Sequence, residues 1–313
     1  MTSRNRQVVL FGFPESEAVA GAFADALHVE SRTVELHRFP DGESRIRLPG
    51  FGTDTAVIYR SLDRPNDKLV ELMLCARHLR ADGARTIVLV APYLCYMRQD
   101  IAFAPGEIVS QRWIGAWLAS LFDGLITVDP HLHRVARLQQ VLPDTCCEVV
   151  SAAPLAGRLA RATFADPVLV GPDQESRQWL EQAANGDPTL DCLVATKTRT
   201  SDREVRLKLP DFQFRERDVI VIDDIASTGH TLAECARIAR QRGARDVKAI
   251  VTHALFPPAD GLPDGCQALS DIWSTDSIPH PSNRIRLAEP IARACARVLV
   301  RLERKNDPVA TQA

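Results

Sequence analysis

Short apolar runs rich in β-branched residues recur along the whole chain and constrain its fold more than any other feature. They alternate with longer amphipathic stretches and lie at residues 8–13, 55–59, 86–93, 124–130, 168–173, 192–196, 219–224 and 247–256. Apolar strands that alternate with helices are typical of a parallel sheet covered by helices on both faces. The sequence therefore predicts an α/β fold in which mainly parallel sheets are flanked by helices.

A motif that occurs twice indicates that the fold is duplicated. Cys75-Ala-Arg-x-x-Arg80-x-x-Gly83-Ala-Arg85 returns with the same spacing as Cys235-Ala-Arg-x-x-Arg240-x-x-Gly243-Ala-Arg245. In both copies the glycine follows a helical segment and precedes an apolar run, as a helix C-cap does. Because 313 residues also exceed one typical core, we expect two domains, 1–150 and 151–313. The sequence leaves open whether the last helix packs on the first domain.

Composition limits the class of protein. Apolar residues make up 45% of the chain, charged residues 25%, and the formal net charge is only −2. This is the profile of a globular protein without the basic surplus of a nucleic-acid binder. The eight cysteines form no C-x-x-C pair, and no run approaches the about 18 apolar residues of a membrane span. We therefore expect reduced thiols and a soluble cytoplasmic protein that binds neither nucleic acid nor membrane.

The strongest chemical signal is the segment 219–231, in which an apolar run ends in Asp223 and Asp224 and is followed by Ser227-Thr228-Gly229-His230-Thr231 and a helix. Backbone N–H groups, hydroxyls and a helix N-terminus in such a turn suit a single phosphate monoester. The two carboxylates would repel that phosphate unless they reach past it to sugar hydroxyls or to a cation. The alternative is an ordinary turn whose aspartates cap the next helix.

Other polar residues also follow apolar runs, where parallel strands deliver side chains to a ligand crevice. His131 follows the run 124–130 and can ligate a metal or donate to phosphate oxygens, whereas His133 is read as a surface histidine. Asp173 ends the run 168–173. Lys197 and Arg199 lie just beyond the run 192–196, in a charged stretch that is otherwise typical of a solvated hairpin.

These segments resemble a known family. The 219–231 segment is similar to the phosphoribosyl-diphosphate (PRPP) binding loop of type I phosphoribosyltransferases and of ribose-phosphate diphosphokinase. Segments in the order of the diphosphokinase favour the latter: Phe39-Pro-Asp41-Gly-Glu43, Pro92-Tyr-x-x-Tyr96-x-Arg98-Gln99-Asp100, Val128-Asp129-Pro-His131, Gly171-Pro-Asp173, Thr252-His-x-x-Phe256 and Thr275-Asp-Ser-Ile-Pro279. The resemblance covers roughly residues 39 to 280.

The resemblance implies two tandem phosphoribosyltransferase-like domains, an ATP-side domain followed by one for ribose 5-phosphate and PRPP. It also implies that the β,γ-diphosphoryl group of Mg²⁺-ATP is transferred to the anomeric hydroxyl of ribose 5-phosphate, giving PRPP and AMP for nucleotide biosynthesis. Active sites shared within a homo-oligomer are implied as well, with Phe39, Asp41 and Glu43 supplied by a neighbouring subunit.

The implied site residues fall into four groups. They are Phe39, Asp41, Glu43, Arg98, Gln99 and His131 for ATP; Asp173, Asp223, Asp224, Ala226, Ser227, Thr228, Gly229, His230 and Thr231 for ribose 5-phosphate; Asp129, His131 and Asp173 for the metal; and Lys197 and Arg199 for catalysis. His230 departs from the family pattern, which more often has glycine there. Two other interpretations remain: a catalytically silent regulatory subunit of such an enzyme, and a phosphoribosyltransferase that consumes PRPP. The cations and acids at 197, 199, 223 and 224 speak against the first, and Phe39, Arg98 and Gln99 against the second.

Overall fold

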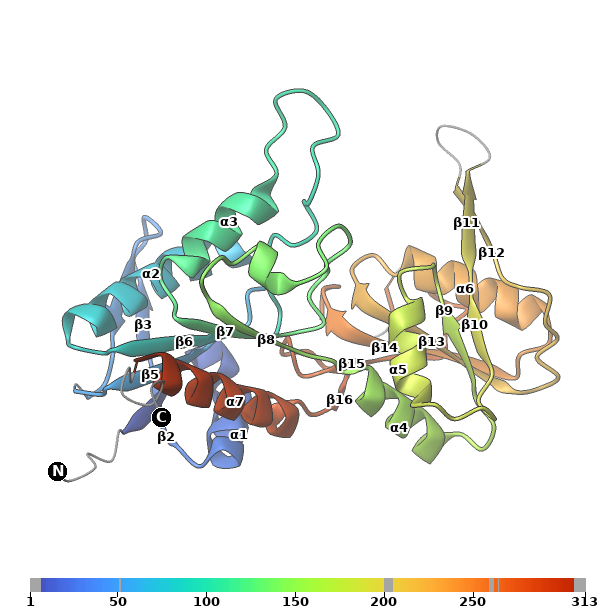
Figure 1. Ribbon diagram of the computed structural model, residues 1–313. Helices are drawn as coiled ribbons and strands as arrows, with labels where there is room; N and C mark the ends of the chain where they lie inside the picture. The colour runs from blue at the N-terminus through green and yellow to red at the C-terminus, as the bar shows by residue number, and fades with distance from the viewer. Residues whose placement is uncertain (1–6, 51, 200–204, 259–261, 264, 307–313) are drawn as a thin grey trace. The chain divides into compact units, whose positions relative to one another are not determined.

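The chain divides into two compact units (Figure 1). The computed structural model describes residues 7–50, 52–199, 205–258, 262–263 and 265–306, without the side chains of residues 197–199, 205–206 and 306. The first unit contains the described residues up to Val150 together with those from Leu287 onward, and the second unit is Ser151–Arg286.

The first unit is built on a parallel sheet with the strand order β2-β1-β5-β6-β7-β8. Its strands are β1 (Val8–Gly12), β2 (Glu30–Thr33), β5 (Thr55–Tyr59), β6 (Thr86–Val90), β7 (Gly124–Val128) and β8 (Cys146–Val150). Its helices are α1 (Glu17–Leu27), α2 (Pro65–Ala81), α3 (Ser110–Ala119) and α7 (Ala288–Asn306), with 3-10 turns at Pro14–Ser16 and Leu138–Gln140. A separate antiparallel hairpin joins β3 (Glu35–Arg38) to β4 (Ser44–Arg47).

The second unit repeats this plan, with the strand order β10-β9-β13-β14-β15-β16, again parallel. Its strands are β9 (Val168–Gly171), β10 (Cys192–Val194), β13 (Asp218–Ala226), β14 (Asp246–Ala254), β15 (Asp271–Thr275) and β16 (Asn283–Ile285). Its helices are α4 (Ala153–Thr163), α5 (Arg177–Ala184) and α6 (His230–Gln241). A second antiparallel hairpin joins β11 (Thr196–Arg199) to β12 (Val205–Lys208).

Helices cover both faces of each sheet, which confirms the predicted fold class. In the first unit α2 and α3 lie on one face and α1 and α7 on the other; in the second, α6 lies opposite α4 and α5 (Figure 1). The apolar stripe of α2 is buried in the core as the helical spacing predicts, with Leu72 wholly inaccessible to solvent. Strands covered in this way need apolar residues on both faces, and β5, β6 and β7 are buried throughout.

The last helix packs on the first unit, an arrangement that the sequence left open. Arg297 and Arg301 of α7 form ion pairs with Glu148 of β8, at 2.7 and 2.5 Å. Gly124 of β7 lies so close to α7 that an added Cβ would stand 2.7 Å from Val298. The second unit therefore ends at Arg286 and not at residue 313, because α7 covers a sheet face that the first half of the chain leaves bare.

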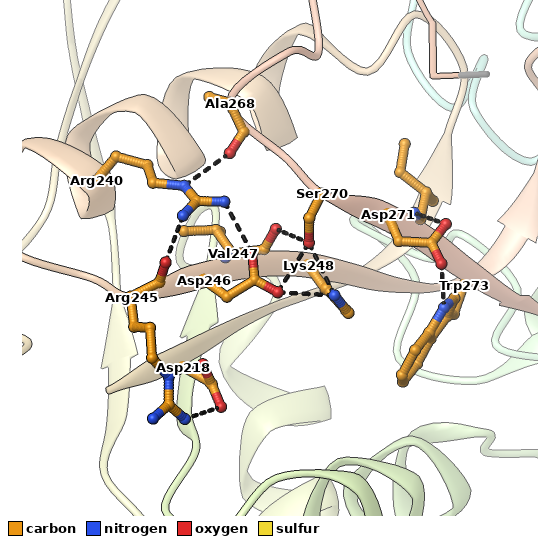
Figure 2. Close-up of polar contacts among 11 residues, drawn as sticks. Asp218, Arg240, Arg245, Asp246, Val247, Lys248, Ala268, Ser270, Asp271 and Trp273 are labelled. Atoms are coloured by element: carbon orange, nitrogen blue, oxygen red, sulfur yellow. Dashed lines mark hydrogen bonds and ion pairs between the residues drawn. The ribbon is translucent and has the colours of Figure 1, made fainter. Parts of the chain in front are cut away.

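Charged side chains gather at the amino ends of β13, β14 and β15 (Figure 2). Asp246 accepts hydrogen bonds from Arg240, at 2.8 Å, and from Lys248, at 2.7 Å, while Arg245 pairs with Asp218. The pKa of Asp246 is lowered to about 2. Partial burial is the largest single influence and acts to raise this pKa, but the hydrogen bonds from Lys248, Ser270 and the Val247 N–H together outweigh it. This mutually neutralised cluster lies at the sheet edge opposite the strand ends predicted to hold the site.

Among the residues that the structure describes, none of the helices combines the length and the apolar character that a membrane crossing requires.

Candidate active site

The segment predicted to bind phosphate forms a strand, a short turn and a helix start in the second unit. β13 ends at Ala226, whose carbonyl accepts the N–H of Leu255, and α6 begins at His230. Gly229 is the N-cap residue and has a φ of 75°, which glycine adopts readily. The first N–H groups of a helix lack partners within that helix and carry partial positive charge. The turn from Ser227 to His230 thus offers donors to an anion.

Side-chain hydroxyls and one imidazole surround this turn. Thr228 and His230 are exposed, and Nδ1 of His230 lies 2.9 Å from Oγ1 of Thr228. Ser227 and Thr231 are half-buried beside them. The imidazole therefore belongs to the turn itself and engages one of its hydroxyls.

The two acids of β13 differ in exposure. Asp224 is 4% exposed, whereas Asp223 is half-buried, and Oδ1 of Asp223 accepts the backbone N–H of Asp224 at 3.0 Å. Both precede the turn on the same strand, so the carboxylates and the phosphate-type turn lie at one edge of the sheet.

Cys266 packs beneath the turn, which the sequence did not indicate. Its Sγ donates to the carbonyl oxygen of Gly229 at 3.6 Å, and an added Cβ at Gly229 would stand 2.5 Å from that sulfur. Burial raises the pKa of Cys266, so the thiol keeps its proton as this bond requires. Glycine is therefore needed at 229 for its backbone and for the room below it.

Asp173 lies at the same sheet edge, two residues after β9, the strand that pairs with β13. Its Oδ1 accepts the backbone N–H groups of Glu175 and Ser176, at 3.1 and 3.2 Å, just before α5. The carboxylate thus organises its own turn, and its predicted contact with ribose 5-phosphate or a metal remains a prediction.

Lys197 and Arg199 lie on the second hairpin. Their backbones are in β11, where Lys197 pairs with Leu207 and Arg199 with Val205. β11 follows β10 after Ala195, whose N–H donates to Gly171 at 2.8 Å. The hairpin therefore leaves the sheet at the edge that carries Asp173, while the two cationic side chains lie outside the described part of the structure.

In the first unit, Asp129 and His131 follow β7. Asp129 is 5% exposed and has a φ of 34°, an uncommon conformation for a residue other than glycine. Such backbone strain is concentrated at functional sites. His133 is exposed, as expected of a surface histidine, but it contacts its neighbour: Nδ1 of His131 lies 3.2 Å from Nε2 of His133, and the two rings are tilted by 44°.

Arg98 and Gln99 lie in the connection from β6 to α3. Gln99 donates to the Ile101 carbonyl and to Glu107, at 3.1 and 3.0 Å, and so shapes this connection. Arg98 is exposed, and no carboxylate among the described residues pairs with it. Since β6 and β7 are adjacent, these residues share a sheet edge with Asp129 and His131.

Phe39, Asp41 and Glu43 form the tip of the first hairpin, a tight turn of the kind that a Pro-Asp-Gly sequence favours. The N–H of Phe39 donates to Glu43 O at 2.8 Å, and the N–H of Glu43 donates to Oδ1 of Asp41 at 3.1 Å. Phe39 is 40% exposed, unusual for a large apolar side chain. The tip can therefore offer an aromatic face to a ligand or to another molecule.

The donor set fits a magnesium ion held largely by substrate. Within the described residues, no three His, Cys, Asp or Glu side chains are placed to hold a metal ion together. Magnesium usually takes one or two carboxylates and completes its octahedron with water and substrate phosphates. Asp129 in one unit and Asp173 in the other are carboxylates of this kind.

Comparison with known proteins identifies both halves of the chain. A family model described as the N-terminal domain of ribose phosphate pyrophosphokinase matches residues 8–121, and a phosphoribosyl transferase domain matches residues 151–277. These matches define a chain with a pyrophosphokinase-type first half and a phosphoribosyltransferase-type second half.

Several relatives align over nearly their whole length. The ribose-phosphate pyrophosphokinase of Methanopyrus kandleri is 33% identical over 294 residues, covering 92% of this chain and 98% of its own. That of Thermococcus kodakarensis is 30% identical over 263 residues, covering 83% and 91%. The crystal structure of phosphoribosylpyrophosphate synthetase from Mycobacterium smegmatis shares the fold, with a TM-score of 0.77 at 22% identity over 95% of this chain and 99% of that one. The chain belongs to the ribose-phosphate pyrophosphokinase family.

Proposed function

We propose that this protein transfers the β,γ-diphosphoryl group of Mg²⁺-ATP to the anomeric hydroxyl of ribose 5-phosphate, and so produces PRPP and AMP. One observation carries the proposal: β13 delivers Asp223 and Asp224 directly before a small-residue turn that opens α6 at His230, in a chain of this family. A phosphate-binding turn beside two carboxylates suits a phosphorylated sugar better than a free phosphate or a nucleotide.

In the ribose 5-phosphate site, the N–H groups and hydroxyls of the turn from Ala226 to Thr231 hold the 5-phosphate. The positive end of α6 favours its negative charge. Asp223 and Asp224 bind the ribose hydroxyls, and Asp173 contacts the sugar or its magnesium ion. The turn thereby fixes the anomeric hydroxyl relative to the sheet edge.

In the ATP site, Arg98 presents a planar guanidinium fork to the polyphosphate, and Gln99 lies beside it. Asp129 and His131 would hold the magnesium ion, which neutralises oxygens of the β- and γ-phosphates when bound. Phe39, Asp41 and Glu43 hold adenine from a neighbouring subunit, so the active form is a homo-oligomer.

In the reaction, the anomeric oxygen forms a bond to the β-phosphorus, and the bond from that phosphorus to the α,β-bridging oxygen breaks. AMP leaves with the bridging oxygen, and the hydroxyl proton is released. Such a loose transition state spreads negative charge over the transferred group. Lys197 and Arg199 on the second hairpin stabilise this charge.

The test is to incubate the purified protein with ribose 5-phosphate, ATP and magnesium and follow phosphorus NMR. We expect PRPP and AMP to appear together, and to require all three components. Conversion of added PRPP and a nucleobase into a nucleoside monophosphate and inorganic diphosphate, without ATP, would instead identify a phosphoribosyltransferase. No reaction by itself, but stimulation of an active synthetase, would identify a regulatory subunit.

A further inference from the structure

A pair of opposite charges is buried in the first unit, away from the residues assigned above. Glu71 of α2 and Arg60, which follows β5, are each 1% exposed, and Nη2 of Arg60 lies 2.6 Å from Oε2 of Glu71. Arg60 also pairs with Glu15 at 2.8 Å and stacks over the Phe13 ring at 3.6 Å. A buried ion pair of this kind is weak evidence of stabilisation, because desolvation offsets its attraction.

Glu71 also reaches the first hairpin. Its Oε1 accepts a hydrogen bond from Oγ of Ser44 at 2.7 Å and lies 3.4 Å from Nη2 of Arg38. Arg38 is the last residue of β3 and Ser44 the first of β4, and the two pair across the hairpin. Glu71 therefore contacts both strands at the point where the tip, residues 39–43, begins.

Little else holds the tip. The hairpin is a separate sheet whose strands pair only with each other among the described residues. Ile46 packs against the core farther from the tip, and the other described β4 side chains are exposed or half-buried. The apolar contact fixes the base of the hairpin. Arg38 also pairs with Asp67 of α2 at 3.2 Å, but both of these side chains are largely exposed, and exposed pairs contribute little. The direction of the tip therefore depends mostly on the bonds to the buried Glu71.

We propose that Glu71 is a positioning residue, which fixes the hairpin tip through Ser44 and Arg38 and thereby sets how Phe39 meets the nucleotide base. Arg60 lies 2.6 Å from the other oxygen of this carboxylate, balances its charge and holds it in place. The proposal rests on the proposed function, since it assigns the consequence to ATP and not to ribose 5-phosphate.

The kinetic test releases the tip without disturbing the buried pair. In the double variant Ser44→Ala, Arg38→Gln we expect KM for ATP to rise about tenfold, the effect of about 1.4 kcal/mol. KM for ribose 5-phosphate should change little, and the urea midpoint should fall only modestly, because Oε1 of Glu71 loses the Ser44 donor while Arg60 stays in place. The matched control is Arg47→Gln, which removes an exposed pair with Glu35 inside the same hairpin and should leave both KM values unchanged. Equal changes in both KM values, or none, would overturn the proposal.

A second variant addresses Glu71 itself. Glu71→Gln alone leaves Arg60 poorly compensated and is prone to unfold, so Glu71→Met is combined with Arg60→Met. This pair of changes keeps the volume, removes the charges and releases the hairpin. We expect a folded protein with the same selective rise in KM for ATP; an unchanged KM would count against the proposal.

A readout independent of activity separates this proposal from the function. Arg45 lies exposed in β4, and cleavage after it by trypsin reports how often the hairpin opens. Both double variants should be cut there faster than wild type. If wild type makes no PRPP but the variants are still cut faster, the function fails while the positioning of the tip by Glu71 stands; equal cutting rates refute that positioning.

Discussion

The two units of the chain share the order of their elements up to the helix after the central strand, yet they end their central strands in opposite ways. In each, the second strand is followed by an antiparallel hairpin, then by the central strand, β5 or β13, and then by the helix that carries the repeated motif. After β5 comes Arg60, a cation buried against Glu71. After the matching residues of β13 come the acids Asp223 and Asp224 and the open turn.

The pairing register makes this comparison residue by residue. Thr55 pairs with Thr86 and Asp218 with Asp246, and these are equivalent positions of the two repeats. Counting along the central strands, Arg60 corresponds to Asp223. One copy of the strand end is thus closed by a buried ion pair next to a hairpin, whereas the other carries the two acids and the turn that we propose bind ribose 5-phosphate.

The repeated motif itself is structural in both units. Arg80 donates to the carbonyl oxygen of Arg85 at 2.7 Å, and Arg240 donates to that of Arg245 at 2.5 Å, the latter drawn in Figure 2. Each guanidinium also pairs with an aspartate, Asp123 or Asp246, at 2.7 or 2.8 Å. The arginine therefore fastens the end of its helix to the next strand, and duplication has preserved the scaffold while the strand ends diverged.

The largest expected effect is a loss of turnover when a cation of the second hairpin is removed, whereas changes at the first hairpin should affect KM for ATP. Lys197→Ala, in the second hairpin, should lower kcat at least about 100-fold, the scale of one preorganised electrostatic donor, and leave binding of ribose 5-phosphate intact. Steady-state kinetics and ribose 5-phosphate titration measure both. Lys208→Ala, on the opposite strand at the pair Thr196↔Lys208, is the control. A near-normal kcat would remove Lys197 from the mechanism.

The next test asks whether α7 stabilises the first unit by covering a face of its sheet, as α4 covers a face of the second sheet. Leu302→Ala removes a side chain that is 4% exposed, and should lower the free energy of unfolding of the first unit by about 2 kcal/mol. Val300→Ala, on the same helix but 46% exposed, should change little. Calorimetry resolves the two units if they melt separately. Destabilisation of the second unit instead would contradict the division of the chain.

A smaller loss of stability, equal in the two units, is expected when the arginine of the repeated motif is removed. Arg80→Ala and Arg240→Ala should each lower the free energy of unfolding by about 1 kcal/mol, because partly exposed charged hydrogen bonds contribute on that scale. KM and kcat should stay near wild type. Arg77→Ala removes an exposed arginine of α2 that forms no ion pair with the described residues, and controls for loss of a helical arginine. A selective loss of activity in either variant would show that this copy has gained a functional role.

The smallest effect concerns pH in the second unit. Burial lowers the pKa of His280, and its Nδ1 already accepts the N–H of Ser282 at 3.1 Å. The unfolded chain therefore binds this proton more readily, so the histidine contributes stability above about pH 6.5 that is lost as pH falls below it. His280→Asn should therefore make the loss of stability at low pH slightly smaller in denaturant melts. An identical pH profile in both proteins would refute the assignment.

The sequence predicts the elements well where a local pattern controls them. The apolar runs, the repeat, the tight turn at Phe39–Glu43 and the turn that opens α6 all depend on residues close together in the chain. The roles of the site residues, including the cations at 197 and 199, remain predictions, since they depend on substrates.

The features that the sequence left open or did not indicate depend on contacts between distant residues. The return of α7 depends on a bare sheet face more than a hundred residues earlier in the chain. Cys266 lies 3.6 Å from Gly229 O although 37 residues separate them. Glu71 is an acid beside an apolar helical stripe, and that position is the one local sign of its burial.

The place of α7 has a consequence for biosynthesis. On the ribosome, the first unit emerges before the second, but the helix that covers α1, β7 and β8 emerges only after Arg286. Until translation passes that point, the nascent first unit exposes an apolar face that chaperones can bind. The half of the protein that is made first is thus the half that is finished last.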